Sequence, residues 1–154
     1  MDESLRREII LENYQNPDNK GLIDDAGYLK VNTNSESCID NLDFMMKIED
    51  GIVRDIRFDG EACAISTSAS SIMTKILIGK TIDEVKNILI NYKNMIEEKD
   101  YDRDILGELY VYDQICKQPN RKNCALLPMV SVEKMLRELE NEKRYTWYKE
   151  IETC

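Results

Sequence analysis

The chain has 154 residues, of which 42% are hydrophobic, with a formal net charge of −9 and a sequence pI of about 4.7. This composition supports the core of one compact domain, residues 1–154, and excludes global disorder. The acidic charge excludes a nucleic-acid partner, because phosphate binding needs a basic surface. No apolar run approaches the roughly 18 residues of a membrane span, so we expect no membrane partner.

The first half of the chain predicts one helix followed by three strands. Residues 4–14 form the helix, which Asn16-Pro17 ends, and residues 28–32 form a first strand. Two runs of alternating apolar and polar residues follow, separated by Asp50-Gly51, a pair typical of a tight antiparallel hairpin. The side chains expected on the buried face are Leu42, Phe44, Met46, Ile48, Ile52, Ile56 and Phe58, with Met45 on the wet face.

The second half predicts helices. Apolar residues recur at helical spacing over 63–78, Gly79 suits the C-terminal cap, and Thr81 and Glu84 match a capping box that opens another helix. A loop over 97–104, a short helix over 107–117 and a last helix carrying Val132, Met135, Leu136 and Leu139 follow. Pro128 is expected in the first turn of that last helix or at a kink. Since strands precede helices, we predict an α+β domain in which a small antiparallel three-stranded sheet packs against helices.

Five cysteines and no histidine set the chemistry available to this chain. The N-terminal sequence MDESLRRE lacks the apolar core of a signal peptide, so we expect a cytoplasmic location, where cysteines are free thiols or metal ligands. Without histidine, Ser-His-Asp and Cys-His catalysis are both excluded, and the serines of 66–71 have no base to activate them. Those small residues more simply allow close helix packing. Any metal site must use Cys, Asp and Glu.

Three cysteines lie where the predicted local structure changes. Cys38 precedes the hairpin, Cys63 lies between the sheet and the next helix, and Cys124 lies in the loop or first turn of the last helix. Such ends of elements are exposed and well placed to converge. Asp40 lies two positions after Cys38, so three thiolates and one carboxylate could complete a tetrahedral Zn²⁺ site. The dipole of the helix that follows Cys63 favours a thiolate there.

Spacing alone leaves other interpretations open. The chain has no paired CxxC motif, so the three cysteines could also be unconnected thiols in an ordinary α+β domain. A purely structural zinc is a further alternative. It predicts that Cys38→Ala unfolds the protein, whereas a functional site predicts a folded protein that has lost its function.

Four segments resemble the SufU/IscU/NifU N-terminal family of iron–sulfur cluster assembly proteins. The sequence ENYQNPDNKG at 12–21 resembles the family's HYxNPxNxG element, with Asn13 where the family often has His. Residues 38–40 resemble its Cys-Gly-Asp, FDGEACAISTSASSIMT at 58–74 closely resembles FxGxGCxISxASASMMT, and RKNCALL at 121–127 resembles RxxCAxL. The resemblance covers most of the chain, in the family's order, and implies a SufE/NifU-like fold.

Two features favour the SufU-like branch of that family. In the IscU branch a His directly precedes the third cysteine, whereas this chain has Asn123 before Cys124. The stretch between Cys63 and Cys124 is also longer than in IscU, which is typical of SufU. The alternative is an IscU-type scaffold on which a [2Fe–2S] cluster is assembled and transferred, since thiolates also suit iron.

The resemblance implies a zinc-dependent acceptor and carrier of persulfide sulfur. In that family, a SufS-like cysteine desulfurase makes the persulfide, and a desulfurase histidine replaces Cys38 on the zinc. Cys38 then attacks the persulfide sulfur, which passes to a downstream iron–sulfur scaffold. Asp40, Cys63 and Cys124 stay as ligands, and Arg121 matches a family arginine near the site. The implied activity is sulfurtransferase-like, with Zn²⁺ as cofactor and iron or a transient [2Fe–2S] cluster as the alternative.

Two parts of the sequence depart from the family pattern. Ile39 replaces the usual Gly, which could stiffen the loop that must release Cys38. Residues after about Arg137 run past the usual family end, so we expect 140–154 to be a C-terminal extension. The aromatic residues of this extension either contact a partner or pack back on the domain; they are Tyr145, Trp147 and Tyr148.

Overall fold

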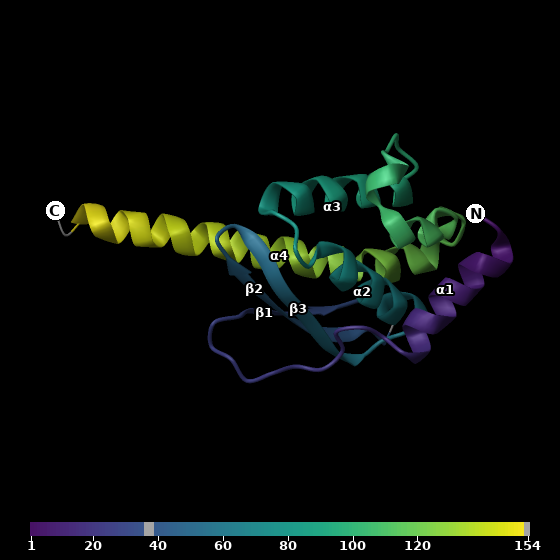
Figure 1. Cartoon of the computed structure of the whole chain (residues 1–154), viewed down its shortest axis with the longest axis horizontal. Coiled ribbons are helices and arrows are strands. Elements are labelled where there is room, and N and C mark those ends of the chain that lie inside the picture. The colour runs from purple at the N-terminus through teal and green to yellow at the C-terminus, as the bar shows by residue number, and fades with distance from the viewer. Residues whose placement is uncertain (36–38, 153–154) are drawn as a thin grey trace.

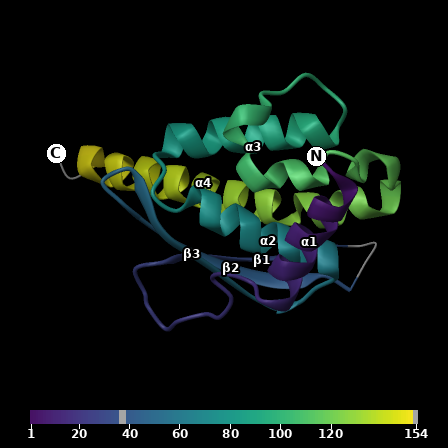
Figure 2. The same ribbon diagram turned by 45° about the vertical axis from the view of Figure 1, so that its right-hand side comes forward.

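A small antiparallel sheet lies beneath a layer of helices in the computed structural model, which describes residues 1–35 and 39–152 (Figure 1). The helices are α1 (Glu3–Gln15), α2 (Ala64–Leu77), α3 (Ile82–Ile96) and α4 (Pro119–Glu152), and the strands are β1 (Leu29–Asn34), β2 (Asn41–Glu49) and β3 (Ile52–Glu61). Helices α2 and α4 contact the sheet, α1 packs on α2, and α3 lies on the side of α4 away from the sheet (Figures 1 and 2). The predicted α+β class with a three-stranded sheet is confirmed.

The sheet is built on the predicted hairpin. Its strand order is β1-β2-β3, and all neighbours are antiparallel. Asp50 and Gly51 form the turn with φ values of 56° and 73°, both positive as a two-residue type I′ turn requires. The register places Phe44 opposite Phe58, and their rings stack with centroids 5.7 Å apart. The alternation read from the sequence therefore gives the buried face on which the helices pack.

Two features of this hairpin differ from the prediction. A register shift between Lys47 and Ile48 brings Val53 into the core with no exposed area, while Ile52, the predicted core residue, is half-buried. Met45, expected to face water, is only 1% exposed. The loop after α1 runs along the other face of the sheet (Figures 1 and 2), and its Ile23 N–H donates to Met45 Sδ over 3.4 Å. The face expected to be wet is therefore partly covered.

The caps of α2 and α3 follow the prediction. Helix α2 ends at Leu77, just before Gly79, whose φ is 90°. At the start of α3, the Thr81 hydroxyl accepts from the Glu84 N–H over 3.2 Å, and the Glu84 carboxylate accepts from the Thr81 N–H over 3.1 Å. This reciprocal pair is the predicted capping box.

The predicted helix over 107–117 is wrong in type. Two 3₁₀ segments, Gly107–Tyr112 and Ile115–Lys117, take its place, and a third, Arg103–Ile105, occupies part of the predicted loop. Four of the five buried residues of this region recur every third position, which matches the three residues per turn of a 3₁₀-helix; they are Leu106, Leu109, Tyr112 and Ile115, and Val111 is the fifth. Burial thus selects the tighter turn over an α-helix.

Helix α4 begins at Pro119 and continues through Pro128, so Pro128 lies well inside it rather than in its first turn. Proline has no N–H to donate to the carbonyl of Cys124, four residues earlier. That carbonyl oxygen instead lies 3.1 Å from the hydroxyl of Ser66 on α2. The far end of α4 projects beyond the sheet (Figure 1). Among the described residues, no helix combines the length and apolar character needed to cross a bilayer.

Candidate metal centre

Asp40 enters the site from the start of the sheet. It directly precedes β2, its side chain is 1% exposed, and its carbonyl accepts from the Ser35 N–H over 3.0 Å. Its carboxylate is held by two donors, one on the N-cap residue of α2 and one in the first turn of that helix. Oδ1 accepts from the Cys63 N–H over 2.7 Å, and Oδ2 accepts from the Ser66 hydroxyl over 2.5 Å. The carboxylate therefore has a defined orientation at the N-terminus of α2.

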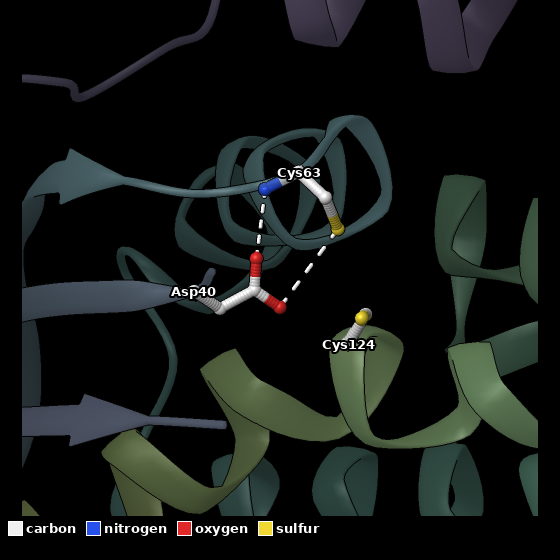
Figure 3. Close-up of side chains that lie close together, drawn as sticks. All are labelled: Asp40, Cys63 and Cys124. Carbon is white, nitrogen blue, oxygen red and sulfur yellow. Dashed lines mark hydrogen bonds between the residues drawn. The ribbon is translucent and has the colours of Figure 1, made fainter. Parts of the chain in front are cut away.

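Cys63 is the N-cap residue of α2. Its φ and ψ of −69° and 171° are those of an extended cap residue, and its sulfur accepts from the Ser66 N–H over 3.4 Å. The same sulfur lies 3.8 Å from Asp40 Oδ2, and Figure 3 joins these two atoms by a dashed line. The predicted position of Cys63 between sheet and helix is thus correct, and the capping geometry turns its thiol toward the carboxylate.

Cys124 reaches the site from α4, an element separate from those that carry Asp40 and Cys63. It is fully buried and lies in the helix itself, six residues into α4, so the prediction of a preceding loop or first turn is wrong. One ligand atom each from Asp40, Cys63 and Cys124 lies within 4.8 Å of the other two (Figure 3). The start of β2, the N-terminus of α2 and the body of α4 therefore converge on one point, although the three residues are far apart in sequence.

Burial and hydrogen bonding have opposite effects on the pKa of Asp40 and the same effect on the pKa of Cys124. Burial would raise the pKa of Asp40, but hydrogen bonds from the Ser66 hydroxyl, the Cys63 N–H and both thiols outweigh it, so the pKa is lowered. Burial raises the pKa of the Cys124 thiol well above its usual range, and the adjoining Asp40 and Cys63 raise it further. A negative carboxylate next to two thiols is a setting in which a cation would favour loss of the thiol protons.

This donor set fits a divalent metal. Zn²⁺ is bound in proteins by thiolate sulfur and carboxylate oxygen, usually with four ligands in tetrahedral geometry. Asp40, Cys63 and Cys124 supply three donors of the required types. A structural site needs a fourth protein ligand, and the sequence offers Cys38 for it. Cys38 lies outside the described residues, so its place in the ligand set stays a prediction.

Three further residues bear on this site: Arg121 and Asn13, which the sequence analysis named, and Ser66, whose contacts it did not predict. Arg121 lies in the first turn of α4 with an exposed side chain, and its role stays a prediction. Asn13, at the position of the family histidine, is buried between α1 and α2, where it accepts from the Ser71 hydroxyl over 2.7 Å. Ser66 was expected only to permit close packing, yet it contacts all three converging residues. Its position three residues after the Cys63 cap was the available signal.

The fold and the site together define a small α+β domain with a thiol–carboxylate cluster that could hold a metal. A family model described as "NifU-like N terminal domain" matches residues 5–125. The chain therefore belongs to the NifU-like N-terminal domain family.

Named relatives agree with this assignment. The chain is 35% identical over 133 residues to the zinc-dependent sulfurtransferase SufU of Bacillus subtilis, covering 86% of this chain and 89% of that protein. It is 27% identical over 132 residues to the iron–sulfur cluster assembly scaffold protein IscU of Thermotoga maritima, covering 86% and 92%. The crystal structure of a SUF-system protein named as a scaffold for iron–sulfur cluster assembly, FiSufU of Fervidobacterium islandicum AW-1, superposes with a TM-score of 0.76 at 26% identity, covering 86% of this chain and 97% of that one.

Proposed function

We propose that this protein is a zinc-dependent acceptor and carrier of persulfide sulfur in iron–sulfur cluster assembly. The observation that carries the proposal is the convergence of ligand atoms from Asp40, Cys63 and Cys124 within 4.8 Å. The similarity to a protein named as a zinc-dependent sulfurtransferase supports zinc as the metal. Its partners in this proposal are a SufS-like cysteine desulfurase and a downstream iron–sulfur scaffold, and it works in the cytoplasm.

The ligands assigned to the zinc are Cys38, Asp40, Cys63 and Cys124. Bound zinc would keep the thiols deprotonated at neutral pH and hold each thiolate in a weakly nucleophilic state. Asp40 and Cys63 are fixed by hydrogen bonds to α2, and Cys124 is fully buried in α4. These three ligands suit a permanent role. Cys38 is the ligand assigned to the exchange, and its neighbour Ile39 is 72% exposed.

The proposed transfer is a thiol exchange at Cys38. The released Cys38 thiolate attacks the outer sulfur of the desulfurase persulfide and forms a new S–S bond with it. The S–S bond on the desulfurase breaks, and its electron pair stays on the desulfurase thiolate. The step therefore moves one sulfur atom and needs no external oxidant or reductant. Arg121, in the first turn of α4, is proposed to orient a ligand or the new persulfide anion.

An IscU-type scaffold is the alternative function. The match to the IscU protein of Thermotoga maritima favours it, and thiolate ligands also bind the iron of [2Fe–2S] clusters. Against it, Asn123 stands where the scaffold branch has the His that precedes the third cysteine. On the scaffold alternative, the same residues would hold iron and sulfide rather than zinc.

Metal analysis combined with a desulfurase assay separates these functions. We would purify the chain anaerobically, measure zinc, iron and acid-labile sulfide, and then follow alanine production by a cognate cysteine desulfurase. We expect about one zinc per chain, as structural ligand sets bind, no sulfide, and stimulation of the desulfurase that Cys38→Ala abolishes. Iron with matching sulfide and little stimulation would instead support the scaffold.

Cys116→Ala is the matched control for Cys38→Ala. Cys116 is a half-buried thiol whose sulfur lies 3.6 Å from the Asp113 carbonyl, away from the converging ligand atoms. Its replacement should leave metal content and stimulation unchanged. Circular dichroism of Cys38→Ala tests the structural-zinc alternative, which predicts an unfolded variant. A folded, inactive Cys38→Ala protein would support the functional site.

A further inference from the structure

Ser66 lies at the junction of the three elements that supply the candidate ligands. It is fully buried at the third position of α2. Its N–H donates to Cys63 Sγ, and its hydroxyl oxygen lies 2.5 Å from Asp40 Oδ2 and 3.1 Å from the Cys124 carbonyl oxygen. A single residue thus touches the strand end, the helix cap and α4. The neighbouring serines behave differently: Ser68 pairs with the Tyr112 hydroxyl, and Ser70 donates to the carbonyl of Ser66.

The Ser66 hydroxyl has one proton for two acceptors. A carboxylate is a stronger acceptor than a peptide carbonyl, and here it is also the nearer of the two. The proton is therefore assigned to Asp40 Oδ2. Because Oδ1 already accepts from the Cys63 N–H, both carboxylate oxygens are held. Oδ2 keeps a further lone pair and lies 3.8 Å from Cys63 Sγ, on the side of the thiols.

We propose that Ser66 is a positioning residue that acts through Asp40 to retain the metal. This deepens the proposed function and rests on it. When Cys38 leaves the metal to engage a persulfide, Asp40, Cys63 and Cys124 are the ligands of this chain that must still hold it. The carboxylate is the only oxygen ligand of the three. Its orientation decides whether Asp40 stays on the metal beside Cys63 and Cys124. The Ser66 hydroxyl fixes that orientation, as partners beyond the ligands do in other metal sites.

The rate of zinc loss to a chromophoric chelator measures this retention. We expect Ser66→Ala to lose zinc about 10- to 100-fold faster than the wild type, the usual effect of removing a group that orients a ligand. Ser70→Ala is the matched control, because Ser70 is equally buried on the same helix and its hydroxyl contacts no ligand side chain in the described structure. It should lose zinc at the wild-type rate. The absorption spectrum of the Co²⁺-loaded chain should change in Ser66→Ala and not in Ser70→Ala.

Two further variants separate positioning from a structural role. If Ser66 acts by satisfying the Cys124 carbonyl, Pro128→Ala would supply the missing N–H and restore zinc retention to Ser66→Ala. If it acts through Asp40, the Ser66→Ala/Pro128→Ala chain still loses zinc faster than the wild type. In that case Ser66→Ala also adds nothing to the rate of zinc loss of an Asp40→Ala chain. Should the single variant fail to fold, the Ser66→Ala/Pro128→Ala chain carries the same test. Failure of both to fold would assign Ser66 to the fold and overturn the proposal.

The outcomes also distinguish this inference from the proposed function. Unchanged zinc loss in Ser66→Ala, from a wild-type chain that binds zinc and stimulates the desulfurase, would overturn the role of Ser66 alone. A wild-type chain that takes up no zinc would overturn both. Faster loss in Ser66→Ala, with no rescue by Pro128→Ala, is the result expected.

Discussion

Gly60 offers a sharp test of how the sheet positions the metal centre. It lies in β3 opposite Leu42, two residues beyond Asp40, with a φ of 133°. A Cβ added there would lie 2.2 Å from the carbonyl oxygen of Asn41, the residue that follows Asp40. Because that oxygen belongs to the backbone, Gly60→Ala must either rotate its own backbone or push the start of β2 away from β3. Pushing the start of β2 away from β3 would also move Asp40, which directly precedes that strand.

The cost of Gly60→Ala follows from these contacts. A residue other than glycine held in this backbone region costs about 1–3 kcal/mol, and each ladder hydrogen bond lost costs about 1 kcal/mol more. With about two ladder hydrogen bonds lost, we expect a loss of about 3–5 kcal/mol in the free energy of unfolding. Gly51→Ala is the control. Its φ of 73° is also positive, but an added Cβ meets nothing within 4 Å, so only the left-handed conformation costs, about 1–2 kcal/mol.

Urea unfolding of the metal-free variants and zinc retention of the loaded ones check this reasoning together. Gly60→Ala should be the less stable variant and should also lose zinc faster than the wild type. Gly51→Ala, at the far end of the hairpin, should retain zinc normally. Equal destabilisation by the two substitutions, or normal zinc retention in Gly60→Ala, would show that the close approach to Asn41 does not position the site.

Two further predictions concern the rest of the fold. Arg6 on α1 forms an ion pair with Asp113 over 2.7 Å, and both side chains are 11% exposed. Arg6→Met leaves the Asp113 carboxylate without this partner, so it should lower the free energy of unfolding in urea by about 3 kcal/mol. The double variant Arg6→Met/Asp113→Leu should recover most of that loss. Additive losses in the double variant would contradict this coupling. Deletion of residues 143–154 should shift the thermal midpoint of unfolding little and leave zinc retention unchanged, because the end of α4 projects beyond the sheet (Figure 1). An unfolded product would show that the domain needs residues from the predicted extension, 140–154, to fold.

Local sequence patterns determined the elements whose interactions are themselves local. The type I′ turn at Asp50-Gly51 needs two adjacent residues that accept positive φ. The α3 capping box needs only Thr81 and Glu84, three positions apart. In the same way, the resemblance of 58–74 and 121–127 to a known family identified Cys63 and Cys124 before any distance was known.

Tertiary contacts decided the features that no short window contains. Met45 is buried because a loop from elsewhere in the chain covers it, and α4 passes through Pro128 although its Cys124 carbonyl loses the helical partner. The 3₁₀ segments follow from which side chains reach the core. Each of these outcomes depends on residues distant in sequence, so the pattern around the position itself does not contain it.

The candidate metal centre depends on both the sequence and the tertiary structure. The sequence by itself determined the chain's class and its candidate donors, because the identities of thiols and carboxylates, and the lack of any histidine, are properties of the sequence. Only the tertiary structure decided that Asp40, Cys63 and Cys124 meet within 4.8 Å and that Ser66 joins them. The physical reason is that a ligand set is defined by distances of a few ångströms, which arise only when β2, α2 and α4 pack together.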